Sequence, residues 1–232
     1  YDALIVRSAT KVKGDLLLNA KNLKVIGRAG EGLDNIDYER AKQLGITIVN
    51  TPHISYISVS ELTIGHMIAL ARNIVQGTTS LREGKWEKEK LMGTELNGKM
   101  LGVIGCGYIG KDVERLALAL GMKVIAVEEC VYDRFVPLAD MLPQADFITI
   151  HVPLTPKTRH LLSAKEFQLM KQGVRIIDCS RGGVIDQDAL YEALVSGKVA
   201  GAALDVFEEE PPKNNKLLTL PNVIATPHMG AQ

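Results

Sequence analysis

The sequence predicts an α/β protein built around a doubly wound parallel sheet. Short apolar runs alternate with stretches of helical periodicity along nearly the whole chain. These runs are apolar on both faces, as strands covered by helices on two sides must be. The chain has 232 residues, of which 46% are hydrophobic and 23% are charged. This is enough for one or two domains with a proper core, and it excludes a disordered chain, a collagen and a coiled coil.

Nine apolar runs are the expected strands. In chain order they are residues 3–6, 23–26, 46–49, 100–104, 123–127, 147–150, 175–177, 200–204 and 223–225. Residues 58–75 begin at a serine and are expected to form one helix, followed by a polar, irregular segment over residues 77–98. Pro52 disfavours helix at the residue before it, so we expect a small first domain over residues 1–51 and a larger second domain after it.

The charge balance excludes several classes of partner. The chain has 27 Lys and Arg against 27 Asp and Glu, whereas a nucleic-acid or membrane-surface binder normally needs a basic face. No apolar run approaches the roughly 18 residues of a membrane span, and no signal peptide is visible. The three cysteines are far apart and include no CxxC pair, so we expect reduced thiols, a cytoplasmic protein and no metal site.

The sharpest motif is a glycine-rich turn between an expected strand and an expected helix. The strand over residues 100–104 runs into Gly105-Cys106-Gly107-Tyr108-Ile109-Gly110, and residues 111–120 have helical periodicity. Gly105 permits the tight turn, Gly107 lets the backbone approach a pyrophosphate, and Gly110 lets the helix pack close to the strand. The helix N-terminus then offers N–H groups and the positive end of its dipole to phosphates. The motif predicts a dinucleotide site, and a structural glycine turn in another α/β protein is the alternative.

A carboxylate supports the dinucleotide prediction. Glu128 ends the next expected strand, 18 residues after Gly110, close to the spacing of about 20 at which a carboxylate meets the adenosine ribose. This favours NAD, because the 2′-phosphate of NADP would be repelled. A second glycine cluster, residues 27–32, has the wrong spacing, and its Glu31 would repel a phosphate. Arg28 in that cluster is assigned to substrate, because an arginine and backbone N–H groups could bind a small anion.

The acid–base candidates begin with the five histidines. His66 lies in an apolar helical stretch and is expected to be structural, whereas His53 and His160 lie in expected loops. His151 and His228 each follow an expected strand, where ligands gather in α/β proteins, and the residues alone do not choose between these two.

Charged residues also follow the late strands. Arg181 comes after residues 175–177, and Glu208–Glu210 come after residues 200–204. An Arg, an acid and a His at consecutive strand ends could bind a carboxylate, orient an imidazole and move a proton. A solvated acidic turn and a surface arginine explain the same residues equally well at this stage.

Taken together, these residues resemble the D-isomer-specific 2-hydroxyacid dehydrogenases, and most of all the branch of that family that acts on 3-phosphoglycerate. The segments that carry the resemblance are residues 5–12, 27–30, 33–37, 50–52, 92–99, 180–186, 203–207 and 226–228. They cover essentially the whole chain in order. The resemblance implies a Rossmann-type cofactor domain over residues 52–230, a smaller flavodoxin-like substrate domain over residues 1–51, and the start of a return to that domain at residues 231–232.

The resemblance also implies roles for individual residues. The family's catalytic residues fall on Arg181, Glu210 and His228, which makes His151 a bystander. Besides Gly105, Gly107 and Gly110, the expected cofactor contacts are Tyr108, Ile109, Glu128, Cys179, Ser180, Asp205 and Gly230. Substrate contacts fall on Arg7 and Arg28. The implied activity is NAD-dependent oxidation of 3-phosphoglycerate to 3-phosphohydroxypyruvate in serine biosynthesis, by a homodimer whose interface would suit residues 77–98 and Trp86.

Some features depart from the family pattern. His53-Ile54-Ser55-Tyr56 replaces a glycine-rich, Asn-containing turn, and the stretch after Cys130 is shorter than usual. The chain begins after the family's first strands and ends soon after His228, so an incomplete substrate domain is expected. A glyoxylate or hydroxypyruvate reductase is the alternative enzyme. An NADH-binding corepressor of the C-terminal binding protein type is the alternative without catalysis.

Overall fold

The protein is described by a computed structural model that covers residues 1–127 and 136–232. The chain divides into two compact units, Tyr1–Tyr56 and Ile57–Gln232. The division falls at the first residue of the long helix Tyr56–Ala71, just after the segment over residues 51–55 that contains Pro52.

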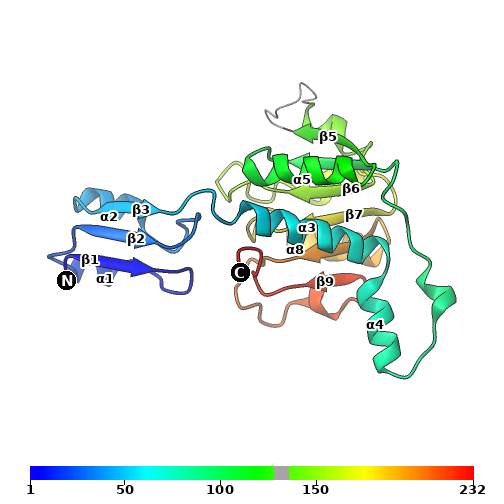
Figure 1. The fold of residues 1–232 in the computed structure, drawn as a ribbon, viewed down its shortest axis with the longest axis horizontal. Coiled ribbons are helices and arrows are strands. Elements are labelled where there is room, and N and C mark those ends of the chain that lie inside the picture. Colours follow the sequence, from blue (N-terminus) through cyan, green and yellow to red (C-terminus); the bar gives the residue numbers. More distant parts are fainter. Residues whose placement is uncertain (128–135) are drawn as a thin grey trace. The chain divides into compact units, whose positions relative to one another are not determined.

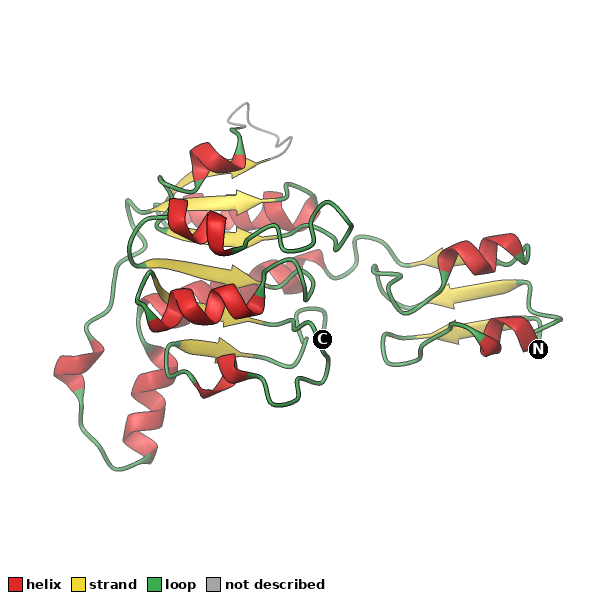
Figure 2. Cartoon of the chain, turned by 180° about the vertical axis from the view of Figure 1, so that it is seen from behind, coloured by secondary structure: helices red, strands yellow, loops and turns green. Residues whose placement is uncertain are grey.

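The first unit is a three-stranded parallel sheet with two short helices. Its elements are β1 (Ala3–Val6), α1 (Asp15–Asn19), β2 (Val25–Arg28), α2 (Tyr38–Gln43) and β3 (Thr47–Asn50), and the strand order is β1-β2-β3. Both helices lie on the same face of the sheet (Figure 2), and Val6, Ile26 and Ala41 are buried there. Ile5 and Val49 face the other way and are 81% and 50% exposed. The expectation that helices cover both faces is therefore wrong for this sheet.

The second unit contains a six-stranded parallel sheet (Figure 1). Its strands are β4 (Met100–Ile104), β5 (Lys123–Val127), β6 (Phe147–Ile150), β7 (Val174–Asp178), β8 (Val199–Leu204) and β9 (Val223–Ala225), in the order β5-β4-β6-β7-β8-β9. The prediction of a doubly wound parallel sheet is confirmed here. The strand order reverses at β4 and β6, and such a switch point is where ligands bind in open α/β sheets.

Helices cover both faces of this large sheet. On one face lie α3 (Tyr56–Ala71) and α5 (Tyr108–Ala119), and on the other lie α6 (Leu138–Met141), α7 (Ala164–Leu169) and α8 (Gln187–Val195) (Figures 1 and 2). The remaining helical elements are α4 (Ile74–Arg82), η1 (Lys88–Leu91) and η2 (Lys216–Thr219). Two apolar clusters fill the space between sheet and helices, and the strands between them are almost wholly buried. This two-sided burial explains why these strands read as continuous apolar runs.

The strands of the large sheet end in register. Ile104 pairs with Val127 and with Ile150, Asp178 pairs with Ile150 and with Leu204, and Leu204 pairs with Ala225. All of these strands are parallel, so the loops that follow them emerge along one edge of the sheet. The candidate residues after these strands are therefore presented on the same side of the second unit.

The helix expected over residues 58–75 is wrong in one respect, because it is two helices. Asn73 adopts the left-handed conformation, with φ of 51°, and separates α3 from α4. Its side-chain amide donates a hydrogen bond to the Met92 carbonyl at 3.1 Å. Asparagine tolerates this conformation better than most residues. The helical pattern looks continuous in the sequence, but it is broken where Asn73 bonds to a residue 19 positions further along the chain.

Two further observations concern the length of the helices and the state of the cysteines. Within residues 1–127 and 136–232, none of the helices has the length and apolarity that crossing a bilayer requires. Cys179 is a free, buried thiol.

Candidate active site

The glycine turn after β4 has the geometry that its pattern predicts. Gly105 has φ of 92°, and a Cβ atom there would lie 2.7 Å from the His151 carbonyl oxygen. A Cβ atom on Gly110 would collide with the carbonyl oxygen of Gly105, so only glycine lets α5 approach the strand this closely. A Cβ atom on Gly107 would meet nothing within 4 Å. Gly107 therefore borders open space, whereas the other two glycines are required by packing.

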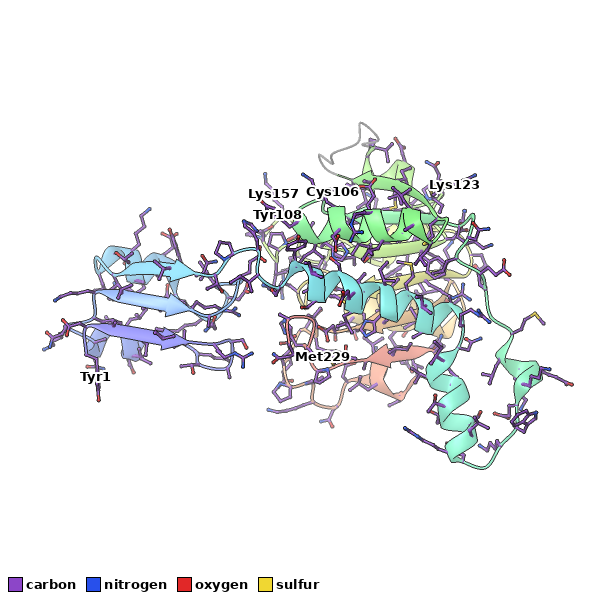
Figure 3. The ribbon with its side chains drawn as sticks, viewed as in Figure 1. Tyr1, Cys106, Tyr108, Lys123, Lys157 and Met229 are labelled. Atoms are coloured by element: carbon purple, nitrogen blue, oxygen red, sulfur yellow. The ribbon has the colours of Figure 1, made fainter. Side chains whose placement is uncertain are left out.

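The open space lies at the N-terminus of α5, which suits a dinucleotide pyrophosphate. Gly107 is the N-cap residue, and no side chain caps the helix. The first N–H groups and the positive end of the helix dipole are thus directed at the space that Gly107 borders. Tyr108 lies at this end of α5 (Figure 3) and is 57% exposed, and Ile109 is half-buried. Glu128, the predicted ribose ligand, lies outside the described residues.

The predicted cofactor contacts after β7 have buried side chains. Asp178 is 3% exposed, and its Oδ1 accepts hydrogen bonds from the backbone N–H and the hydroxyl of Ser180, at 2.8 and 2.6 Å. Burial raises the pKa of Asp178 to about 6, against the lowering effect of these two bonds. Cys179 and Ser180 are 8% and 6% exposed. Their side chains thus shape the turn that carries Arg181, and the N–H of Ser180 is engaged within this turn by Asp178.

Asp205 organises the loop after β9. It is 1% exposed, and its Oδ1 accepts hydrogen bonds from the Thr226 hydroxyl and the Met229 N–H, at 2.6 and 2.9 Å. Its Oδ2 accepts from the Gly230 N–H at 2.8 Å. Both oxygens of this predicted cofactor contact, and the N–H of Gly230, are therefore engaged within the chain. No local sequence pattern predicts this role, because Asp205 and Gly230 are 25 residues apart.

Glu210 and His228 form a close pair. His228 Nδ1 and Glu210 Oε2 are 2.7 Å apart, and Glu210 Oε1 accepts from the Phe207 N–H at 3.1 Å. The hydrogen bond to Glu210 raises the pKa of His228, and it outweighs the opposing effects of burial and of Arg181. Burial alone would raise the pKa of Glu210, but the hydrogen bonds from His228 and Phe207 outweigh it, so this pKa is lowered. The pair therefore favours an imidazolium beside a carboxylate, with Nε2 as the ring nitrogen left for a ligand.

Arg181 is the third candidate residue of this edge, beside Glu210 and His228. Arg181 is half-buried, its Nη1 donates to the Ser180 carbonyl at 2.8 Å, and its charge acts on both Glu210 and His228. His228 has φ of 50°, an uncommon conformation for a residue other than glycine. Such backbone strain gathers at functional sites. The structure thus brings Arg181, Glu210 and His228 together, at the ends of the adjacent strands β7, β8 and β9.

The other histidines have different surroundings. Burial lowers the pKa of His151 to about 3, and its Nε2 lies 2.9 Å from the Thr149 hydroxyl. His160 Nε2 lies 3.2 Å from Glu208 Oε1, and His53 lies in the first unit. His66 is buried beneath the loop after β9. His160 and His228 both lie near a carboxylate, but His228 has the shorter contact, at 2.7 Å, and the charge of Arg181 acts on it.

The predicted substrate contacts lie in the first unit. Arg7 directly follows β1, and Arg28 is the last residue of β2, where it pairs with Val6 and Asn50. Both arginines are thus at the carboxyl edge of the small sheet. Arg28 Nη1 donates to the Ala29 carbonyl at 3.1 Å, so part of this side chain supports its own loop. Over the described ranges, no group of three or more His, Cys, Asp or Glu residues could hold a metal ion.

Comparison with known proteins gives a consistent family. Residues 64–230 match the family model described as D-isomer specific 2-hydroxyacid dehydrogenase, NAD binding domain. The chain is 53% identical to a D-3-phosphoglycerate dehydrogenase of Methanocaldococcus jannaschii, over 99% of this chain and 46% of that protein. It is also 53% identical to a hydroxypyruvate reductase of Thermotoga maritima, over 99% of this chain and 78% of that protein.

A solved structure agrees with these relatives. A D-lactate dehydrogenase from Aquifex aeolicus, in complex with NAD and lactic acid, superposes with a TM-score of 0.89 at 32% identity, over 99% of this chain and 76% of that one. The chain thus spans about half the length of the archaeal relative and about three quarters of the other two. It belongs to the D-isomer specific 2-hydroxyacid dehydrogenases, and residues 64–230 are its NAD-binding domain.

Proposed function

We propose that the protein is an NAD-dependent D-2-hydroxyacid dehydrogenase whose catalytic residues are Arg181, Glu210 and His228. One observation carries this proposal: His228 Nδ1 lies 2.7 Å from Glu210 Oε2, and the charge of Arg181 acts on both. An imidazole that a carboxylate orients can exchange a proton with a hydroxyl group. A guanidinium beside it can hold a carboxylate with two parallel hydrogen bonds.

Each of the three residues has a separate role in the proposed reaction. NAD held at the glycine turn over residues 105–110 would supply the hydride acceptor for oxidation and, in its reduced form, the hydride donor for the reverse reaction. Arg181 binds the substrate carboxylate and fixes the orientation of the molecule. His228 Nε2 removes the hydroxyl proton during oxidation and donates a proton to the carbonyl oxygen during reduction. Glu210 holds the ring through Nδ1 and stabilises the imidazolium that forms.

For the substrate, we propose 3-phosphoglycerate, oxidised to 3-phosphohydroxypyruvate. Two arginines at one sheet edge, Arg7 and Arg28, suit a phosphorylated acid. The name of the archaeal relative supports the same choice. A hydroxypyruvate reductase is the second candidate, because a relative with that name is equally similar to the chain and is matched over more of its length.

A comparison of substrates tests both candidates. NADH oxidation by the purified protein is followed with phosphohydroxypyruvate, hydroxypyruvate and glyoxylate, each at several concentrations. We expect the highest kcat/KM with phosphohydroxypyruvate. A preference for hydroxypyruvate or glyoxylate would favour the reductase, and NADH binding without turnover on any of the three would favour a binding protein.

We also propose that the protein forms a homodimer through the segment over residues 77–98. Three large apolar side chains of this segment are strongly exposed: Trp86, Met92 and Leu81, at 82%, 86% and 59%. Such a patch is typical of a protein interface. Sedimentation of the wild type and of Trp86→Lys tests the proposal. We expect a dimer that the substitution weakens, and a monomeric wild type at micromolar concentration would refute it.

A further inference from the structure

His66 is a buried polar side chain that the proposed mechanism does not use. It lies on α3 and is 5% exposed. Its Nδ1 lies 3.7 Å from Cys179 Sγ, and its Nε2 lies 3.4 Å from the Thr226 hydroxyl oxygen. Cys179 is two residues before Arg181, and Thr226 is two residues before His228. One imidazole thus contacts both turns that carry the proposed catalytic residues.

The direction of each hydrogen bond follows from chemistry. A carboxylate only accepts, so the single hydroxyl hydrogen of Thr226 is donated to Asp205 Oδ1, at 2.6 Å. Toward His66 the Thr226 oxygen can then only accept, so His66 Nε2 must carry the hydrogen. In a neutral imidazole Nδ1 is then an acceptor, and it faces the thiol of Cys179.

The charge states of the surrounding groups agree with this direction. Burial lowers the pKa of His66, and the charge of Asp205 opposes this effect only in part. Burial also raises the pKa of Cys179 to about 12, so its thiol keeps a hydrogen to donate. Each polar group in the chain from Cys179 to Asp205 therefore has a partner with a matching role, as buried polar groups require.

We propose that His66 is a positioning residue, a neutral imidazole with its hydrogen on Nε2 that fixes the Thr226 hydroxyl on Asp205. Asp205 also accepts from the N–H groups of Met229 and Gly230. The chain from His66 through Thr226 to Asp205 therefore holds both sides of His228, whose left-handed backbone needs such support. The effect on catalysis rests on the proposed function, but the tautomer does not.

The first test reads the tautomer directly. Long-range ¹H–¹⁵N correlation spectra of the ¹⁵N-labelled protein distinguish hydrogen on Nε2 from hydrogen on Nδ1, and loss of signals in His66→Gln assigns them. We expect the Nε2–H form with no titration through the neutral pH range. An Nδ1–H form, or an imidazole that titrates there, would overturn the inference whether or not the protein is a dehydrogenase.

The second test uses two substitutions that separate the ring nitrogens. The side-chain amide of glutamine reaches the position of Nε2, whereas that of asparagine reaches only the position of Nδ1. We expect His66→Gln to keep kcat within about twofold and His66→Asn to lose about tenfold, with the Kd of NADH unchanged in both. Equal kcat values in the two variants, high or low, would show that His66 contributes packing alone.

A matched pair at Thr226 keeps the inference testable if His66→Asn does not fold. Thr226→Ser retains the hydroxyl, and Thr226→Val removes it at nearly the same volume. We expect the serine variant to keep its kcat and the valine variant to lose about as much as His66→Asn. If wild-type turnover were absent, the proposed function would fail while the tautomer measurement still decided the inference. Full kcat in the valine variant would overturn the inference that the Thr226 hydroxyl positions His228.

Discussion

Two regions at the carboxyl edge of the large sheet are built on opposite principles. The turn after β4 depends on three glycines. Gly105 and Gly110 pack closely against backbone atoms, and Gly107 borders open space. The loops after β8 and β9 are filled with side chains, and Asp205 and Glu210 each accept more than one hydrogen bond. Under the proposed function, the first region presents backbone to a cofactor and the second presents ionisable groups to a substrate. We therefore expect added side-chain atoms to impair the glycine turn, and the removal of side-chain atoms to impair the loops after β8 and β9.

The largest expected effect is on turnover, from the loss of His228. His228→Asn removes the ring nitrogen that we propose moves the proton, and we expect kcat to fall by about 10²–10⁴-fold, the usual contribution of a general acid–base group. The Kd of NADH should stay within about twofold, because the glycine turn is unchanged. Steady-state kinetics and NADH fluorescence titration measure the two quantities.

His160→Asn is the matched control for His228→Asn. His160 also lies near a carboxylate, with Nε2 3.2 Å from Glu208 Oε1 and a side chain 39% exposed. We expect nearly full turnover from this variant. If His228→Asn lost NADH binding together with turnover, the separation of the two regions would be wrong.

The two regions also differ in how much of them the sequence predicts. A glycine turn is a local feature, so its strand, its turn and its helix are all visible in consecutive residues, and the strands that follow are apolar because both faces are covered. The acid–base loops are assembled from residues 18 to 47 positions apart along the chain, Arg181, Glu210 and His228. From the residues alone, His151 remained an equal candidate to His228, and only the resemblance to a family separated them.

The features missed by the sequence depend on tertiary contacts. The break between α3 and α4 coincides with the hydrogen bond from Asn73 to Met92. Both carboxylate oxygens of Asp205 accept hydrogen bonds from residues of the loop after β9, namely Thr226, Met229 and Gly230. His66 reads as an ordinary helical core residue until its two partners are seen. None of these partners is within 15 residues of the group it contacts, so no local pattern records them.

The next largest expected effect is on cofactor affinity, and substitutions at two glycines test it. Gly107→Ala places a methyl group in the open space with backbone angles that alanine accepts, since its φ is −67°. We expect about tenfold weaker NADH binding with an unchanged melting temperature. Gly110→Ala instead forces a methyl group onto the Gly105 carbonyl, so it should also destabilise the fold by about 1–3 kcal/mol. Calorimetry and NADH titration separate the outcomes, and equal melting temperatures for the two variants would contradict this geometry.

A smaller effect is expected on the pH dependence, from Glu210→Gln. Oxidation needs neutral His228, so its rate should rise with pH through the raised pKa of this residue, and reduction should fall through the same pKa. Glutamine removes the carboxylate that raises this pKa, so both profiles should move to lower pH, with reduction at pH 8 slower by about tenfold. Profiles of kcat/KM in both directions measure the shift. Unmoved profiles would show that Glu210 does not set the protonation of His228.

The smallest expected effect is on substrate choice, from Arg7 in the first unit. The Asn35 side-chain amide donates to the carbonyls of Arg7 and Thr10, at 2.9 and 2.8 Å, and so holds the loop after β1. Arg7 is exposed on this loop, where its guanidinium can bind a phosphate by charge-assisted hydrogen bonds. Arg7→Gln should raise the KM for phosphohydroxypyruvate by about five- to tenfold and leave that for hydroxypyruvate unchanged. Arg40→Gln is the control, because Arg40 bonds to Gln43 on α2 and should affect neither substrate. An equal rise in both KM values for Arg7→Gln would mean that Arg7 binds no phosphate, and it would leave the hydroxypyruvate reductase as the better description.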